Sequence, residues 1–335
     1  MEKRRLGTSE IEVSVFGLGC WPLGGGPGWG DQDERESIAT VHAALDYGIN
    51  FFDTAEGYNN GRSEEVLGKA LEDRRDKALI ATKVSPTNTE PATLRAHCEA
   101  SLRRLRTDYI DLYQVHWPIW PATNNSVEDA FATLLDLQQE GKIRAIGVSN
   151  HGVEQLRQVL ATGVPIVSNQ LCYNLLSRAI ESEILPFCRE HGLGVITYMG
   201  LMQGLLAGIY RSPDEVPPFR ARTRHFSKDR PMARHGEPGA EAETFAALER
   251  IRQIADELGY PMAHVALAWV ASKPGISCVL VGSRKRDQLA RNIEAASLKL
   301  PPEVIAKLDE ATEELRIKLG PNADYWQGQE NSRIR

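Results

Sequence analysis

The chain has 335 residues, of which 42% are hydrophobic, and a formal net charge of -6. This length suits one large α/β domain or two average ones, and the acidic balance argues against nucleic acid as a partner. Five widely spaced cysteines without a CxxC pair favour reduced thiols in a cytoplasmic protein over a disulfide framework or a metal site. We expect no secretion signal and no membrane contact, because no apolar run approaches about 18 residues.

The chain opens with a predicted β-hairpin over residues 2–13, and short apolar runs then alternate with amphipathic stretches. Alternating strands and helices imply parallel strands joined by crossover helices. Eight such units in this length predict an α/β fold, a (β/α)8 TIM barrel, forming a single domain over residues 1–335. A doubly wound sheet with a second domain is the rival fold, but no segment reads as a linker. The strand-like runs lie near residues 15–19, 49–53, 78–83, 110–115, 144–148, 165–169, 194–198 and 278–281.

Three parts of the sequence depart from a bare barrel. Residues 209–242 are rich in Pro and Arg and lack apolar periodicity, which is typical of a lid or a disordered excursion. A C-terminal tail of about residues 311–335 contains Tyr325 and Trp326, which either fold over the barrel mouth or pack on its side. Additional helices are predicted over residues 243–258, 261–273 and 301–320.

Four polar residues follow the second, third and fourth of the predicted barrel strands: Asp53, Tyr58, Lys83 and His116. The C-terminal ends of the strands face the active site of such a barrel, so these side chains are expected to meet there. A phenol titrates near pH 10, and Lys83, held by Asp53, would lower the pKa of Tyr58 toward neutrality. His116 would orient a carbonyl oxygen or share in proton delivery. Taken singly, each residue also fits a loop, strand-end or core role.

Several segments together resemble the aldo-keto reductase superfamily. The first are FDTAEGYNNGRSEEVLGKAL, ATK and DYIDLYQVHWP, and the later ones are GKIRAIGVSNH, SNQLCYNLLSR, ITYMGLMQGLLAGIY and VLVGSRKRDQLARN. They run in order over roughly residues 3–310, and they are most similar to a bacterial branch with a long loop after strand seven. The resemblance implies a (β/α)8 barrel that uses NADP(H) to reduce aldehydes and ketones. It also implies that Asp53, Tyr58, Lys83 and His116 form the catalytic tetrad.

The resemblance further implies contacts with the cofactor. Ser149, Asn150 and Gln170 would hold the nicotinamide carboxamide, and Tyr198 would stack on the nicotinamide ring. Residues 199–205 would bind the pyrophosphate. The full set of implied cofactor contacts is Gly19, Cys20, Trp21, Asp53, Ser149, Asn150, Gln170, Tyr198, Met199, Gly200, Leu201, Gln203, Leu205, Arg220, Gly282, Ser283, Arg284, Gln288, Arg291 and Asn292.

Some positions depart from the family pattern. Ile209 stands where the family commonly has a lysine. Either Arg220 or Arg222 in the long loop supplies a replacement cation, or these arginines form a solvated cluster. Gly282-Ser283-Arg284 is expected to open a helix, and a helix N-terminus with arginine suits an adenosine 2′-phosphate. This cluster favours NADP(H) over NAD(H). Arg291 replaces a glutamate that the family commonly has there, so adenine recognition is expected to differ.

Substrate contacts are implied at Trp21, Tyr58, His116 and Trp117. The leading interpretation is NADPH-dependent, reversible reduction of a small-molecule carbonyl, or oxidation of a polyol, with Tyr58 as general acid. An NADP(H)-binding regulatory subunit with little turnover is the alternative, and a barrel lyase or isomerase without nicotinamide is a third. The sequence leaves the substrate and the oligomeric state open, with a monomer preferred.

Overall fold

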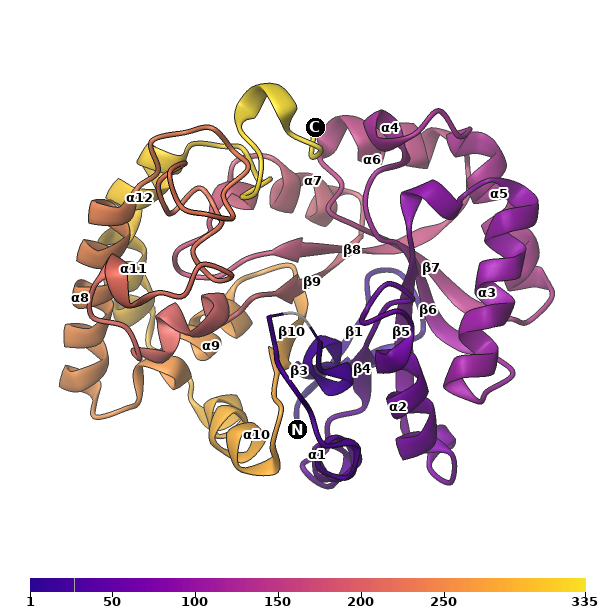
Figure 1. Ribbon diagram of the computed structural model, residues 1–335, viewed down its shortest axis with the longest axis horizontal. Helices are drawn as coiled ribbons and strands as arrows, with labels where there is room; N and C mark the ends of the chain where they lie inside the picture. The colour runs from indigo at the N-terminus through magenta and orange to yellow at the C-terminus, as the bar shows by residue number, and fades with distance from the viewer. Residues whose placement is uncertain (27) are drawn as a thin grey trace.

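The computed structural model describes residues 1–26 and 28–335 and contains a closed barrel of parallel strands in its described part (Figure 1). The order around the barrel is β10-β3-β4-β5-β6-β7-β8-β9, so the first and last barrel strands pair and close it. The predicted (β/α)8 barrel is confirmed. The strands are β3 (Phe16–Gly19), β4 (Phe51–Asp53), β5 (Leu79–Val84), β6 (Ile110–Val115), β7 (Ile143–Ser149), β8 (Ile166–Cys172), β9 (Gly194–Tyr198) and β10 (Ile276–Gly282).

The predicted hairpin forms the floor of the barrel. Its strands, β1 (Lys3–Arg5) and β2 (Glu12–Ser14), pair antiparallel. Leu6, Ile11 and Val13 are buried in one cluster with side chains from the barrel interior. The hairpin therefore covers the N-terminal end of the barrel with apolar side chains.

Helices surround the barrel on its outside (Figure 1). Both α8 and α9 precede β10, as predicted, but the helix expected over residues 301–320 is divided at Thr312, whose hydroxyl bonds back to Leu308 O at 3.1 Å. Such back-bonding competes with regular helix geometry. No helix of the described residues is long and apolar enough to cross a membrane. The helices are α1 (Glu34–Asp46), α2 (Arg62–Leu71), α3 (Pro91–Leu105), α4 (Ile119–Ala122), α5 (Val127–Gln139), α6 (Val153–Ala161), α7 (Ile184–Glu190), α8 (Glu241–Leu258), α9 (Met262–Ser272), α10 (Arg286–Ile293), α11 (Pro302–Ala311) and α12 (Glu313–Leu319).

Strand periodicity decides which polar groups reach the open end. Phe51, Ala81 and Leu112 belong to the apolar cluster inside the barrel. Side chains two residues apart on a strand share a face, so Asp53 and Lys83 also point inward, one step nearer the mouth. The barrel interior thus changes from apolar at the floor to polar at the mouth.

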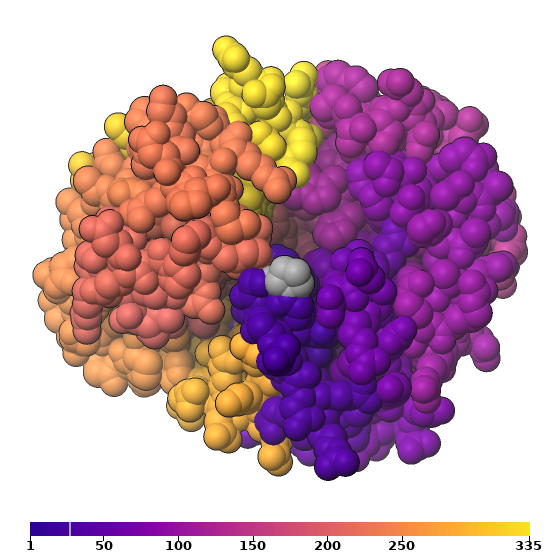
Figure 2. Space-filling model, viewed as in Figure 1, coloured from indigo at the N-terminus to yellow at the C-terminus, as the bar shows by residue number. Residues whose placement is uncertain are grey.

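The long segment after β9 is ordered against the C-terminal tail. Arg224 donates hydrogen bonds to Leu319 O at 2.7 Å and Asn322 O at 3.0 Å, and the His225 ring stacks on Tyr325 with centroids 5.2 Å apart. These contacts favour the lid over the disordered excursion. Figure 2 shows the tail in yellow, part of the long segment in orange and the N-terminal region in indigo around a hollow on one face.

Candidate active site

Lys83 lies at the centre of the predicted tetrad. Its Nζ donates hydrogen bonds to Asp53 Oδ1 at 2.6 Å, Thr54 O at 2.8 Å and Tyr58 Oη at 3.3 Å. Burial opposes the charge of Lys83, but Asp53 and Tyr58 outweigh it and raise the pKa of the ammonium above its usual value. Lys83 is therefore a permanent cation held against the phenol oxygen.

Tyr58 lies in the loop after β4 and is partly exposed. Enclosure of the phenol raises its pKa above 10, although Lys83 acts to lower it. The expectation of a net lowering is wrong, because desolvation of the phenolate outweighs attraction to Lys83. Tyr58 is consequently a protonated phenol across the neutral range, which suits a proton donor.

His116 follows β6 and faces Tyr58 edge-on, with ring centroids 5.7 Å apart. Burial, with a further contribution from the Lys83 charge, lowers the pKa of His116 to about 3. The imidazole is therefore neutral near pH 7, and its contribution is a hydrogen bond to an oxygen rather than a positive charge. This favours the orienting role over proton delivery.

A polar group from the ends of β7, β8 and β9 borders the tetrad. Gln170 Nε2 donates to Asp53 Oδ2 at 2.7 Å, and Ser149 Oγ donates to Gln170 O at 3.0 Å. Tyr198 Oη donates to Asn150 Oδ1 at 2.6 Å. A register shift in the pairing of β8 with β7, between Ile146 and Gly147, is the kind of bulge that re-aims side chains near functional sites. The structure thus brings together the four residues predicted near the nicotinamide.

The hydrogen bond from Gln170 to Asp53 was not predicted from the sequence. A second glutamine, Gln114 on β6, donates to the same Asp53 Oδ2 at 3.3 Å, and its own Oε1 is buried without a partner among the described residues. Strand alternation could have placed Gln114 inside the barrel, because it lies two residues after the inward-facing Leu112. Nothing in the sequence reports the bulge that turns Gln170 inward.

Aromatic rings line the mouth on the β3 side. Trp21 stacks on Tyr58 with centroids 5.6 Å apart and planes at 26°, and Trp29 meets Trp21 edge-on at 5.5 Å. Phe219, from the long segment, lies 6.4 Å from Trp21. Gly19 pairs with Asp53 between the neighbouring strands β3 and β4, and Cys20 N donates to Asp53 O at 2.8 Å. Glycine has no side chain and the side chain of Cys20 is buried, so Trp21 supplies the side chain at this part of the rim.

The tail completes the opposite rim. Trp326 meets Trp117 edge-on at 6.1 Å and lies parallel to Tyr198 within 23° at 6.4 Å. Arg333 lies 3.6 Å above the Trp117 ring and pairs with the buried Asp324 at 2.7 Å. The sequence left open whether the tail folds over the barrel mouth or packs on its side. Trp326 reaches the mouth, whereas Tyr325 is buried next to it.

The segment after β9 has an unusual backbone. Met199, Met202 and Gln203 adopt positive φ angles of 59°, 43° and 54°, and Gly204 follows at 103°. Non-glycine residues seldom adopt this conformation, and its concentration marks functional sites. Around Gly204 lie Ile209 and the guanidinium of Arg220, which donates to Tyr210 Oη at 2.7 Å. Arg220 therefore occupies the neighbourhood where the family's lysine was expected. Gly200, Leu201 and Leu205 belong to the same segment.

The region after β10 differs in detail from expectation. Helix α10 begins at Arg286, so Gly282, Ser283 and Arg284 precede the helix instead of opening it. Arg284 donates to Gln32 Oε1 at 2.9 Å, and Arg286 lies 3.6 Å from the Glu36 carboxylate. The cationic cluster is therefore partly engaged by the β3–α1 loop and the first turn of α1. Gln288 accepts from Arg284 N, Asn292 donates to Ser283 Oγ and Arg291 is exposed.

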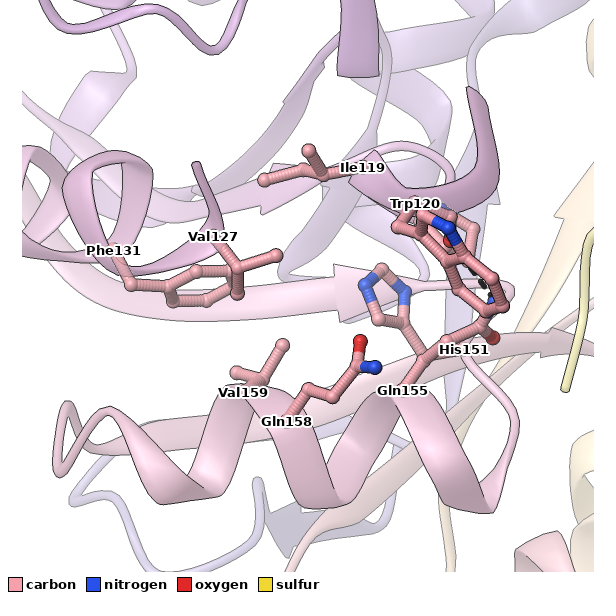
Figure 3. Close-up of a pocket in the computed structure, with 9 residues that line it drawn as sticks. Ile119, Trp120, Val127, Phe131, His151, Gln155, Gln158 and Val159 are labelled. Atoms are coloured by element: carbon pink, nitrogen blue, oxygen red, sulfur yellow. Dashed lines mark hydrogen bonds between the residues drawn. The ribbon is translucent and has the colours of Figure 1, made fainter. Parts of the chain in front are cut away.

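A small cavity lies outside the barrel wall, between α5 and α6. Figure 3 shows the ring of His151 pointing into it beneath Trp120. Burial lowers the pKa of His151 to about 4, and its Nδ1 donates to Ser149 O at 2.9 Å. No tetrad residue lines this cavity. His151 therefore bonds the backbone at Ser149 and lines this outer cavity.

Comparison with known proteins agrees with this geometry. The model of the aldo/keto reductase family matches residues 15–313. The NADH-specific methylglyoxal reductase of Escherichia coli is 34% identical over 90% of this chain and 95% of its own length. The aldo-keto reductase YhdN of Bacillus subtilis is 35% identical over 86% of this chain and 87% of its own.

Solved structures extend the match. A glycerol dehydrogenase of Gluconobacter oxydans superposes with a TM-score of 0.79 at 31% identity, covering 96% of both chains. An aldo-keto reductase of Klebsiella pneumoniae, solved in complex with NADPH, superposes at 0.73 with 26% identity, covering 100% of this chain and 99% of its own. The chain belongs to the aldo/keto reductase family. It is accordingly an oxidoreductase that acts on carbonyl groups.

Proposed function

We propose that the protein reduces an aldehyde or ketone reversibly with NADP(H), and that Tyr58 is the general acid. The observation that carries the proposal is the hydrogen-bonded cluster of Asp53, Lys83 and Tyr58 at the open end of the barrel. A protonated phenol beside a buried cation can release a proton to an oxygen that gains negative charge. We place the reaction in the cytoplasm, because all five cysteines are buried free thiols.

The residues present fit a nicotinamide dinucleotide. Positive φ angles at Met199, Met202, Gln203 and Gly204 are the kind of backbone conformation found in anion-binding nests, and Arg220 lies beside Gly204. Ser149, Asn150 and Gln170 would hold the carboxamide, and Tyr198 would support the ring. When bound, this cofactor supplies the hydride.

The chain's own residues perform the remaining steps. Trp21 and Trp117 border the carbonyl substrate and exclude water from it. The neutral His116 donates a hydrogen bond to the carbonyl oxygen, and Tyr58 Oη passes its proton to that same oxygen. Lys83 stabilises the resulting phenolate, while Asp53 holds Lys83 in place. In the reverse direction, the phenolate accepts the proton of the alcohol.

The preference for NADP(H) over NAD(H) rests on the cations after β10, chiefly Arg284 with Lys285 and Arg286 beside it. A structural neighbour was solved with NADPH, whereas one relative is named as NADH-specific. Dissociation constants of NADPH and NADH, measured by quenching of tryptophan fluorescence, decide between them. Tighter binding of NADH would refute the preference.

Turnover tests the role of Tyr58. Tyr58→Phe removes one oxygen, so NADPH should bind almost normally while reduction of methylglyoxal or glyceraldehyde falls by about 10²–10⁴-fold. Retention of more than about a tenth of the wild-type rate would exclude Tyr58 as the acid, because general acid catalysis contributes more than this. A wild-type enzyme that binds NADPH but turns over none of a broad set of carbonyls would instead indicate the regulatory alternative.

A further inference from the structure

Gln155 is a buried glutamine in the first turn of α6 that bonds three separate segments of the chain. Its Oε1 accepts hydrogen bonds from Gly152 N and from Arg335 N, each at 3.0 Å. Its Nε2 donates to Arg333 O at 2.7 Å and to Trp120 O at 3.2 Å (Figure 3). A primary amide has two donor hydrogens and an oxygen that accepts two bonds. Every hydrogen-bonding position of this side chain is therefore used.

The helix itself requires only part of these bonds. The bond from Gly152 N to Gln155 Oε1 caps the start of α6, and glutamate or glutamine serves equally well at this position of a capping box. The two donor hydrogens of the amide take no part in the cap. They bond instead to the loop after β6 and to the C-terminal tail.

The two segments that accept from Gln155 meet again at the barrel mouth. Trp120 lies three residues after Trp117 in the same loop. Arg333 belongs to the tail, and its guanidinium lies 3.6 Å above the Trp117 ring. Gln155 thus bonds the backbone on both sides of this contact, and a shift of either segment would separate Arg333 from Trp117.

Arg333 extends the connection to the ring of Trp326. Its Nε donates to Asp324 Oδ2 at 2.7 Å and its Nη2 donates to Asp324 Oδ1 at 2.8 Å. The buried Asp324 also accepts from Trp326 N at 3.2 Å. Trp326 then contacts Trp117 and Tyr198 at the rim. A path of hydrogen bonds through the tail therefore links α6 with the aromatic wall of the mouth.

We propose that Gln155 is a positioning residue for the substrate side of the mouth, where it holds Trp117 and Trp326 in place without touching the reacting atoms. The inference rests on the proposed function, in which a carbonyl substrate lies against this wall. The hydrogen bonds of Lys83 run to the β4 side of the barrel, away from α6 and the tail. Gln155 should therefore affect KM for the substrate and leave the chemical step nearly unchanged.

The experiment compares wild type with Gln155→Glu at about pH 8.5, where the two N–H groups that donate to this side chain favour an ionised carboxylate. The substitution keeps the oxygen that caps α6, but a carboxylate has no hydrogen to donate to Trp120 O or Arg333 O. Gln158→Glu is the matched control, because Gln158 is an exposed glutamine of the same helix. The measurements are amide hydrogen exchange of residues 322–335 without cofactor, the dissociation constant of NADPH, and KM and kcat for benzaldehyde.

In Gln155→Glu, the amides of residues 322–335 should exchange faster than in wild type. KM for benzaldehyde should rise about 2- to 30-fold, the range for residues that act through a packed network, while kcat and the NADPH dissociation constant change by less than about twofold. Gln158→Glu should match wild type in all four quantities. In a Trp326→Ala background, Gln155→Glu should raise KM less than it does alone, because the two residues act along one path.

Three results would overturn the proposal: unchanged exchange of the tail, faster exchange with an unchanged KM, or a rise in KM matched by equally weaker NADPH binding. If Gln155→Glu does not fold, Asp324→Asn weakens the next link of the path, the pairing with Arg333, and the same pattern is expected. Amide exchange needs no turnover. If wild type reduces no carbonyl, the proposed function fails, and exchange still shows whether Gln155 holds the tail.

Discussion

Two glutamines donate to one oxygen of Asp53, and they should contribute unequally to stability. We consider Gln170→Leu and Gln114→Leu, which replace each amide by an apolar side chain of similar volume. Gln170 Nε2 lies 2.7 Å from Asp53 Oδ2, whereas Gln114 Nε2 lies 3.3 Å from it. The carboxylate is almost completely buried and paired with Lys83 on its other oxygen.

The magnitudes follow from these contacts. A hydrogen bond to a charged group contributes about 1.5–3 kcal/mol, so Gln170→Leu should lower the free energy of unfolding by about 2 kcal/mol. The 3.3 Å hydrogen bond of Gln114 stabilises the folded protein only weakly. The burial of its unpartnered Oε1 destabilises the folded protein. These two effects oppose each other, and Gln114→Leu should change stability by less than about 1 kcal/mol in either direction.

Urea unfolding without cofactor, followed by tryptophan fluorescence, measures both differences. Omitting the cofactor matters because Gln170 is also proposed to hold the carboxamide, and a purely cofactor-directed role would leave the apo protein unchanged. If Gln114→Leu destabilises as much as Gln170→Leu, or if Gln170→Leu is neutral, the reasoning from bond length and charge is refuted.

Three further outcomes are expected. The pKa of Tyr58 is raised and that of His116 is about 3. The kcat for reduction should therefore be flat from pH 5 to about 9 and fall above pH 10, where the phenol loses its proton. An inflection of kcat near pH 6.5 would contradict a neutral His116. Glu36→Gln removes the carboxylate that lies 3.6 Å from Arg286, so Arg286 loses a partner that competes with the 2′-phosphate. The ratio of NADPH to NADH affinity should rise about two- to fivefold in fluorescence titrations. An unchanged ratio would place the 2′-phosphate away from Arg286. Trp326→Ala opens the rim beside Trp117, so KM for aldehydes should rise while NADPH affinity changes less; steady-state kinetics giving a lower NADPH affinity alone would instead assign Trp326 to the cofactor.

Much of the fold could be predicted from short-range signals. The strands expected at residues 110–115 and 194–198 match β6 and β9 in their bounds, because fully buried parallel strands read as continuous apolar runs. The helix expected over residues 301–320 is two helices, since the back-bonding of Thr312 depends on a single side chain that periodicity does not register.

The site was predictable where residue type and strand position sufficed. Asp53 and Lys83 meet because neighbouring parallel strands deliver them to one rim. The sign of the Tyr58 shift was not predictable, because desolvation depends on how much protein surrounds the ring. The contact of Phe219 with Gly28 could not be predicted either, because it joins segments that are far apart in the chain. Local sequence patterns contain no information about such long-range contacts.

The pairing of β3 with β10 has a consequence for biosynthesis. β3 is the first barrel strand to be synthesised, but one of its two neighbours in the sheet, β10, is the last barrel strand to be synthesised. Until residues 276–282 leave the ribosome, the growing sheet presents an open edge, and unpaired edges of apolar parallel strands promote aggregation. Long-range closure of this kind also slows folding. Substitutions that weaken β3 or β10 should therefore reduce the yield of soluble protein in cells before they reduce the specific activity of the molecules that mature.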